Sequence, residues 1–189
     1  SVKSRIAISS DYGAVSSDSY TDEMGTEYTF SWEGDDKTIE VTANENGIIS
    51  SCLYTDNANS DGQKPSVNKA SRDALYKAAC GYVKQLNPAI YGKLKINGIT
   101  NTEGAANDSY YFDIQRYENG ILVDGEGGYV AVSSDGKELK DFFLNFTTGI
   151  EFEKADKIIS RDAAQRAYAD KIGFSLCYGS NYADNKITA

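Results

Sequence analysis

Histidine is absent from all 189 residues of the sequence. Its absence excludes the Ser-His-Asp triad, the Cys-His pair and His-ligated zinc from the chemistry of this chain. Also missing is any run of about 20 apolar residues, the length that a membrane-spanning helix requires. The first residues, Ser1-Val2-Lys3, do not resemble a signal peptide. We interpret the sequence as part of a longer precursor, so a missing leader says nothing about location.

Cysteine is scarce, with three residues at Cys52, Cys80 and Cys177. An odd number cannot pair completely within one chain, and the spacings match no zinc motif. We therefore predict three free thiols that behave as small apolar side chains. The sequence predicts no metal and no cofactor.

Positive charge is also limited, because 19 Lys and Arg face 28 Asp and Glu, for a net charge of −9. Such a chain repels the phosphates of nucleic acids and anionic membrane surfaces. A basic or neutral partner is favoured instead. The hydrophobic fraction of 40% is sufficient for a packed core, which argues against global disorder.

An internal repeat is present with a spacing of 89 residues. Ser71-Arg72-Asp73-Ala74 recurs as Ser160-Arg161-Asp162-Ala163. The same spacing relates Asn46-Gly47 to Asp135-Gly136, Val41 to Val130 and Tyr54 to Phe143. Three separate elements share one register, which indicates two copies of one structural unit.

The local patterns predict the same elements in both copies. Alternating apolar residues and turn signals predict strands at 28–32, 39–41 and 48–54, then at 110–114, 129–132 and 139–146. The longer connection at 116–128 is expected to form an extra hairpin or bulge. Apolar stripes and Ser N-caps predict helices at 71–86 and 160–172. Further strands are expected at 5–10, 94–100 and 174–178.

These elements predict an α+β fold of two tandem repeats. Each helix can bury its apolar stripe only against the apolar face of a sheet, so each unit should be an antiparallel sheet of about four strands packed on one helix. We place the repeats at residues 1–88 and 89–189. If each unit instead begins with its helix, the middle unit covers 66–146. In either case the strand at 174–178 needs a sheet edge, in its own chain or in a neighbouring molecule by strand exchange.

A family resemblance is visible in the second copy. It contains Tyr110-x-Phe112-x-x-x-Arg116-x-x-Asn119-Gly120-Ile121, followed by Asp135-Gly136 and Ser160-x-x-Ala163. This pattern resembles the YcdB/YcdC repeat, a branch of the PepSY-like domains of secreted and surface-layer-associated proteins of Gram-positive bacteria. The resemblance covers most of 66–178, and the first copy matches it less well because it has no Arg and Asn-Gly-Ile segment.

The resemblance implies a cystatin-like α+β unit on the outside of the cell. PepSY domains also occur in propeptides of thermolysin-like peptidases, where they are associated with inhibition and assisted folding. Many other relatives are non-enzymatic modules of cell-envelope proteins. The family brings no catalytic or metal-binding residues that could be transferred to this sequence.

Acidic clusters offer the remaining candidates for chemistry: Asp18 with Asp22 and Glu23, Asp35-Asp36, and Asp124 with Glu126. A glycosidase needs two carboxylates facing each other across a cleft, and calcium needs several oxygen ligands. We interpret all three clusters as solvated turns, where Asp is favoured for local hydrogen bonds. The glycines at 125, 127 and 128 lack the Lys-Ser/Thr of a phosphate loop.

The strand that begins at Tyr110 has two different faces. Phe112 and Ile114 should face the core, whereas the opposite face carries Tyr111, Asp113, Gln115 and Tyr117. Tyrosine mixed with polar groups is typical of recognition surfaces, so these four residues are our candidate interaction surface. Tyrosine is also common in half-exposed strands that bind no other molecule, so these residues can equally be structural.

The function we expect is a non-enzymatic, extracellular binding or structural module of a larger cell-envelope protein. Its partner would be a protein or a cell-wall component. One alternative is an inhibitor or folding-assisting, propeptide-like module of a secreted peptidase, and a second is a carboxylate-based hydrolase. Surface-layer repeats or a His-Glu-x-x-His peptidase domain in the flanking sequence would separate the first two.

Overall fold

The computed structural model of the chain describes residues 2–6, 8–23, 25–56, 70–100, 109–152, 159–173, 179–181 and 186–188. The chain divides into two compact units, Ser1–Phe152 and Glu153–Ala189. The first unit contains a large antiparallel sheet and helix α1 (Arg72–Leu86). The second contains helix α2 (Arg161–Lys171) and the antiparallel pair β9 (Gly179–Asn181) and β10 (Lys186–Thr188).

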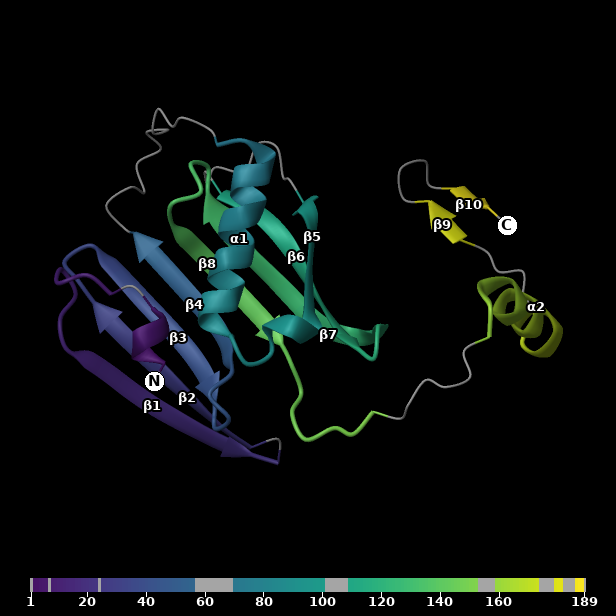
Figure 1. Ribbon diagram of the computed structural model, residues 1–189, viewed down its shortest axis with the longest axis horizontal. Coiled ribbons are helices and arrows are strands. Elements are labelled where there is room, and N and C mark those ends of the chain that lie inside the picture. Colours follow the sequence, from purple (N-terminus) through teal and green to yellow (C-terminus); the bar gives the residue numbers. More distant parts are fainter. Residues whose placement is uncertain are drawn as a thin grey trace. The chain divides into compact units, whose positions relative to one another are not determined.

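The sheet of the first unit has eight strands in the order β1-β2-β3-β4-β8-β7-β6-β5 (Figure 1). Their bounds are β1 Val15–Asp22, β2 Gly25–Glu33, β3 Lys37–Asn44, β4 Ile49–Asp56, β5 Leu94–Thr100, β6 Ser109–Glu118, β7 Ile121–Ser133 and β8 Leu139–Asn145. Strands β1 to β4 form one meander and β5 to β8 form another with the same internal order. The predicted α+β class is confirmed.

The expected division into two separate sheets is not observed. The two meanders join where Ser51, Cys52 and Leu53 of β4 pair with Phe143, Phe142 and Asp141 of β8. A four-stranded meander by itself would leave the N–H and C=O groups of its last strand unpaired. Pairing β4 with β8 satisfies both edges at once, which explains why one continuous sheet forms.

The 89-residue spacing relates individual hydrogen bonds. Gly47 N–H donates to Asn44 C=O at 2.8 Å, and Gly136 N–H donates to Ser133 C=O at the same distance. Both glycines have a positive φ, 72° and 73°, as the turn requires. At the helices, Ser71 and Ser160 both cap the N-terminus by accepting a hydrogen bond from the N–H three residues later. The predicted helices are confirmed.

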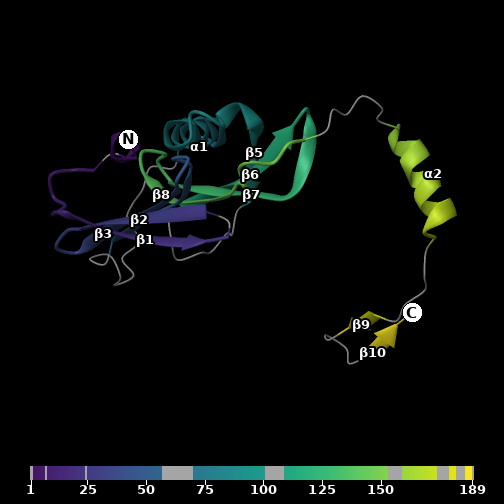
Figure 2. The ribbon, with the colours of Figure 1, turned by 90° about the horizontal axis from the view of Figure 1, so that it is seen from below.

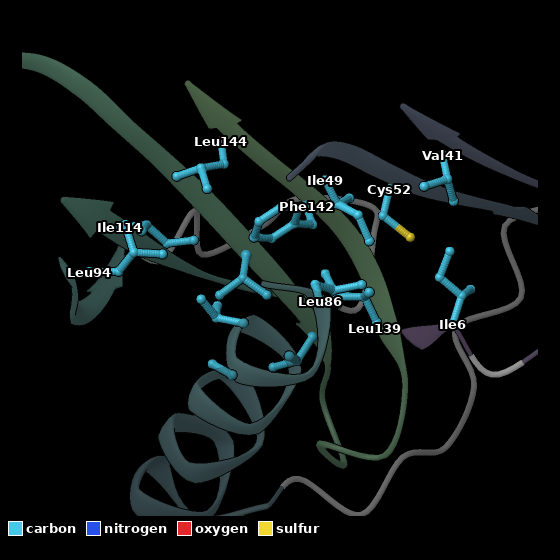
Figure 3. Close-up of a cluster of buried hydrophobic side chains, with 14 of the residues drawn as sticks. Ile6, Val41, Ile49, Cys52, Leu86, Leu94, Ile114, Leu139, Phe142 and Leu144 are labelled. Atoms are coloured by element: carbon cyan, nitrogen blue, oxygen red, sulfur yellow. The ribbon is translucent and has the colours of Figure 1, made fainter. Parts of the chain in front are cut away.

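Helix α1 packs on the strands that follow it in the chain. Its buried residues, Leu75, Ala79, Val83 and Leu86, follow the predicted stripe, and the helix lies against β5, β6 and β7. Figure 2 shows α1 and the N-terminal segment on one side of the sheet. Figure 3 shows Leu86 beside Ile49 and Phe142 in the core between α1 and the sheet.

The strand expected at 5–10 is wrong. Residues Lys3–Arg5 form a short 3-10 turn instead. The guanidinium of Arg5 donates to the C=O groups of Leu86 and Gly47, each at 2.7 Å, and Ile6 is buried in the core. The side chains of Arg5 and Ile6 hold the N-terminal segment over the face of the sheet. The segment therefore cannot pair with an edge of the sheet as a strand.

Other expected elements have clear outcomes. The strand at 94–100 is confirmed as β5. The extra hairpin at 116–128 is also confirmed, because β6 and β7 turn at Asn119 and Gly120, both with positive φ, and their register shifts between Gln115 and Tyr117. The segment 174–178 lies outside the described residues. Among the described residues, no helix is long and apolar enough to cross a membrane.

Candidate interaction surface

Strand β6 presents its two faces as predicted. Phe112 and Ile114 are buried on the side of the sheet that carries α1. Side chains alternate along a strand, so Tyr111, Asp113, Gln115 and Tyr117 lie on the opposite side, which we call the outer face. The four candidate residues therefore share one surface, but the side chains around them divide it into two parts.

An aromatic row crosses the first part of the outer face. It consists of Tyr111 on β6, Tyr129 on β7 and Phe143 on β8. The ring centroids of Tyr111 and Tyr129 are 5.6 Å apart, and those of Tyr129 and Phe143 are 6.0 Å apart. Leu53 on β4 continues the row as a diagonal neighbour of Phe143. Phe143 is 46% exposed and Leu53 is 42% exposed, so the row offers apolar area to solvent.

Polar contacts fix the second part, at the other end of β6. The side-chain Nδ2 of Asn97 donates to Gln115 Oε1 at 2.8 Å. The Nζ of Lys95 lies 3.6 Å from the centre of the Tyr117 ring, a close cation–π contact. Gln115 and Tyr117 are thus held by β5, and their conformations are set before any partner arrives.

Two carboxylates border the aromatic row. Tyr129 donates its hydroxyl to Asp141 Oδ2 at 2.9 Å. Burial, together with this hydrogen bond, raises the pKa of Tyr129 to about 12. The phenol therefore stays protonated and holds Asp141 against the row. Asp113 is exposed on β6 directly opposite Tyr129.

Sequence reasoning found Tyr111 but missed Tyr129, Phe143 and Leu53. Tyr129 and Phe143 come from the two strands that follow β6, whereas Leu53 comes from β4, which is distant in the sequence, and the register of the sheet makes them neighbours. A signal was available: Tyr129 alternates with the buried Val130 and Val132, which places it on the outer face. The β4–β8 pairing that brings in Leu53 had no such signal.

A buried ion cluster lies on the other side of β6, around Arg116. This side chain is only 3% exposed and forms ion pairs with Glu118 at 2.7 Å and with Glu126 at 2.5 Å. It also donates to Thr147 C=O at 2.7 Å and stacks on the ring of Phe146. The cluster fixes the segment after β8 to the sheet. Glu126 also accepts from the Thr147 N–H, so both groups hold this carboxylate in the cluster.

The turn interpretation of the acidic clusters is right for one, right in part for a second, where Glu23 lies in the turn after β1, and wrong for the third. Asp35 and Asp36 form the turn between β2 and β3. Asp18 and Asp22 instead lie within β1, and the cluster of residues 124 and 126 lies within β7. Within the described part of the chain, no three Cys, Asp or Glu side chains converge as a metal site. Cys52 and Cys80 are free thiols, whereas residue 177 lies outside the described residues.

A cavity of about 330 Å³ opens on the helix side, between the N-terminal segment, the ends of β3 and β4, and α1. Tyr12, Tyr54 and Tyr82 supply its aromatic lining. Burial raises the pKa of Tyr54 and Tyr82, and Tyr82 donates its hydroxyl to Lys137 C=O at 2.6 Å. The lining contains four cationic side chains, Arg5, Lys37, Lys137 and Lys140, and two anionic ones, Asp56 and Glu138.

Comparison with known proteins identifies one family. The model for the YcdB, YcdC repeated domain matches residues 1–145. Compared with the resemblance read from the sequence over 66–178, this range adds β1 to β4 and ends before Ser160-x-x-Ala163. No curated protein and no solved structure matches the chain.

Proposed function

Because the chain belongs to the family of the YcdB, YcdC repeated domain, we propose that it is a non-enzymatic binding or structural module of a larger cell-envelope protein. The outer face described above is its recognition surface, and a protein or a cell-wall component is its partner. The extracellular or cell-surface location follows from the resemblance to secreted and surface-layer-associated proteins.

The aromatic row is the observation that carries this proposal. Large apolar side chains are expensive to expose in water, and rings in a row give a partner contact area at a low cost in conformational entropy. The Tyr117 ring and the amide of Gln115 are held in place beside the row. A surface that is ordered before binding loses less entropy when a partner docks.

Within this proposal, the chain consists of tandem cystatin-like, PepSY-like units in which the helix comes first. The packing of α1 on β5, β6 and β7 supports this order. In such a unit the helix covers one side of the sheet and leaves the other side free along its whole length. Successive units would then present a continuous outer face to a partner.

The test is a binding assay with purified peptidoglycan and with cell-wall protein extracts. The double variant Tyr111→Ala/Tyr117→Ala should lose binding while circular dichroism shows an unchanged fold. Ile150→Ser is the matched control, since it removes a side chain that is 48% exposed outside the sheet. Equal binding by both variants would show that the outer face is not the recognition surface.

Catalysis is tested separately with peptidase, glycosidase and esterase substrates. The proposal expects no saturable turnover by the chain. Turnover that disappears when one carboxylate is changed to its amide would contradict the non-enzymatic assignment. A separate assay adds the chain to a thermolysin-like peptidase, so that inhibition of the peptidase would also be detected.

A further inference from the structure

The two edges of the eight-stranded sheet differ in how they are protected. At one edge, the register of β5 shifts between Ile96 and Ile99, and α1 packs against the strand. The hydroxyl of Tyr76 on that helix also donates to Ile96 C=O at 3.3 Å. A register shift and a helix packed against the strand both disfavour the addition of another strand at this edge. This edge is therefore protected.

At the other edge, β1, the described residues show no register shift and no packed helix. All eight of its residues pair with β2 in an unbroken register, and all eight are exposed. The strand contains no proline, no lysine and no bulge, which are the usual means of protecting an edge. Among the strands that the structure describes, β1 has only β2 as a neighbour.

The hydrogen-bond pattern shows which groups of β1 are open. Gly34 N–H donates to Lys37 C=O between β2 and β3. Antiparallel ladders alternate, so even-numbered residues of β2 bond to β3 and odd-numbered residues bond to β1. On β1, the partners of those odd-numbered residues are even-numbered. The N–H and C=O groups of Ser17, Ser19 and Thr21 therefore point away from the sheet.

One of these open groups is covered from within the strand. The N–H of Ser19 donates to Asp18 Oδ1 at 2.8 Å. The carboxylate thus occupies the position that the C=O of an added strand would take. When a backbone C=O replaces it, Asp18 becomes free to bind a cation.

The charge around β1 determines what kind of strand would fit. From Ile6 to Asp36 the sequence has eight Asp and Glu residues and no Lys or Arg. Asp18 and Asp22 lie on the outer face of β1, and Glu27 lies beside them on β2. Side chains of an added strand would stand about 5 Å from those of β1. Asp18, Tyr20 and Asp22 alternate on this face, so cations at every second position of that strand would meet the two carboxylates and the Tyr20 ring between them.

We propose that β1 accepts an extended segment of a partner protein that carries Lys or Arg at alternate positions, which adds to the sheet as a ninth strand. Backbone hydrogen bonds to Ser17, Ser19 and Thr21 supply affinity, and Asp18 and Asp22 select the alternating cations. This site is separate from the outer aromatic row, so it goes beyond the function proposed above.

The test uses the peptide Ac-KTKTKTK-NH2 and isothermal titration calorimetry. Binding should weaken at least about tenfold when alternate peptide nitrogens are methylated, because methylation removes the donors of the added strand. This comparison uses the unmodified protein, so it does not depend on the folding of a variant. Equal binding of the methylated peptide would reduce the interaction to charge attraction and overturn the proposal.

Two protein variants extend the test. Ser19→Pro removes one outward N–H while the ladder to β2 remains, and Asp18→Asn/Asp22→Asn removes the selecting charges. Each should weaken binding at least about tenfold. Glu151→Gln/Asp170→Asn, which neutralises two exposed carboxylates outside the sheet, is the matched control and should bind as the original chain does. Unchanged binding by Asp18→Asn/Asp22→Asn would also contradict the proposal.

Two further results separate this site from other possibilities. The variant Tyr111→Ala/Tyr117→Ala should bind the peptide normally, so failure of the outer-face proposal leaves this one standing. Sedimentation of the protein alone should show a monomer. A dimer that Ser19→Pro abolishes would assign the edge to a second copy of the chain and overturn the proposed partner.

Discussion

The side chain of Asn87 pairs with the backbone of Ile49 as a second strand would. Its Oδ1 accepts from Ile49 N–H at 2.9 Å, and its Nδ2 donates to Ile49 C=O at 2.9 Å. Asn87 is itself only 2% exposed at the C-terminal end of α1. One amide thus completes the hydrogen bonding at the start of β4 and connects the helix to the first meander.

Replacing this amide should be costly. Asn87→Ala leaves both the N–H and the C=O of Ile49 buried without partners, so we expect a loss of about 2–4 kcal/mol in the free energy of unfolding. Urea denaturation measures this directly. Asn87→Asp, which keeps the acceptor and loses the donor, is also expected to destabilise. A loss below about 0.5 kcal/mol in Asn87→Ala would show that water replaces the amide.

Arg116 should be at least as sensitive, because its loss leaves the Glu126 carboxylate without its cation. We expect Arg116→Ala to cost about 3–5 kcal/mol in the free energy of unfolding, since Glu126 would remain buried without its partner. In Arg116→Ala/Glu126→Gln, removal of both charges should recover part of that loss. Thermal melts of the two variants and of the original chain test this. Equal stability of the single and double variants would contradict a direct coupling.

The Glu118 carboxylate predicts a pH dependence. The pKa of Glu118 is below its ordinary value, mainly because of the hydrogen bond from Lys93 and secondly because of the one from Arg116. A carboxyl with a lowered folded-state pKa stabilises the fold above its unfolded value, about 4.3. This contribution is lost as pH falls from that value through the lower folded-state pKa. Urea unfolding at pH 7, 5, 4 and 3 should show the decline, and Glu118→Gln should reduce its steepness.

Two glycines should respond to alanine in opposite directions. Gly81 lies exposed in the middle of α1 with open space around its Cα, so Gly81→Ala should stabilise the chain by about 0.5–1 kcal/mol. At Gly128 on β7, a Cβ would collide with the C=O of Phe143 on β8. We expect Gly128→Ala to destabilise by about 1–3 kcal/mol. Gly92→Ala, at another open position, is the control for a change with no contact.

Cysteine reactivity should separate the thiols. Cys52 is fully buried on β4, and burial raises the pKa of its thiol to about 12. Cys80 on α1 is partly exposed. At pH 8, a thiol reagent should therefore modify Cys80 in the native protein and spare Cys52. In denaturant we expect three reactive thiols per chain. A value of one would reveal a disulfide.

The sequence predicted elements whose causes are local. Both helix starts were found because Ser71 and Ser160 cap them by contacts within one turn. Strand β1 was missed because both of its faces are exposed, and alternation reports burial of one face. The same rule identified the outer face of β6, because the buried residues Phe112 and Ile114 alternate with the residues of that face.

What the sequence could not predict depends on contacts between distant residues. The union of the meanders depends on three residue pairs between β4 and β8, about 90 residues apart. The hydrogen bonds of Asn87 to Ile49 were not predicted, because Asn87 before Pro88 was interpreted only as the end of the helix. The carboxylate of Glu126 was likewise assigned to a turn, since its partner Arg116 lies on another strand.

The pairing of β4 with β8 has a consequence for synthesis of the chain. Strand β4 ends at Asp56 and its partner β8 begins at Leu139. At about 5–20 residues per second, the ribosome needs several seconds to supply the missing neighbour. During that interval β4 is a partly apolar edge strand, unpaired on one side, at which other nascent chains can aggregate. The pairing of β4 with β8 closes the long loop between Asp56 and Leu139, and such non-local contacts slow folding.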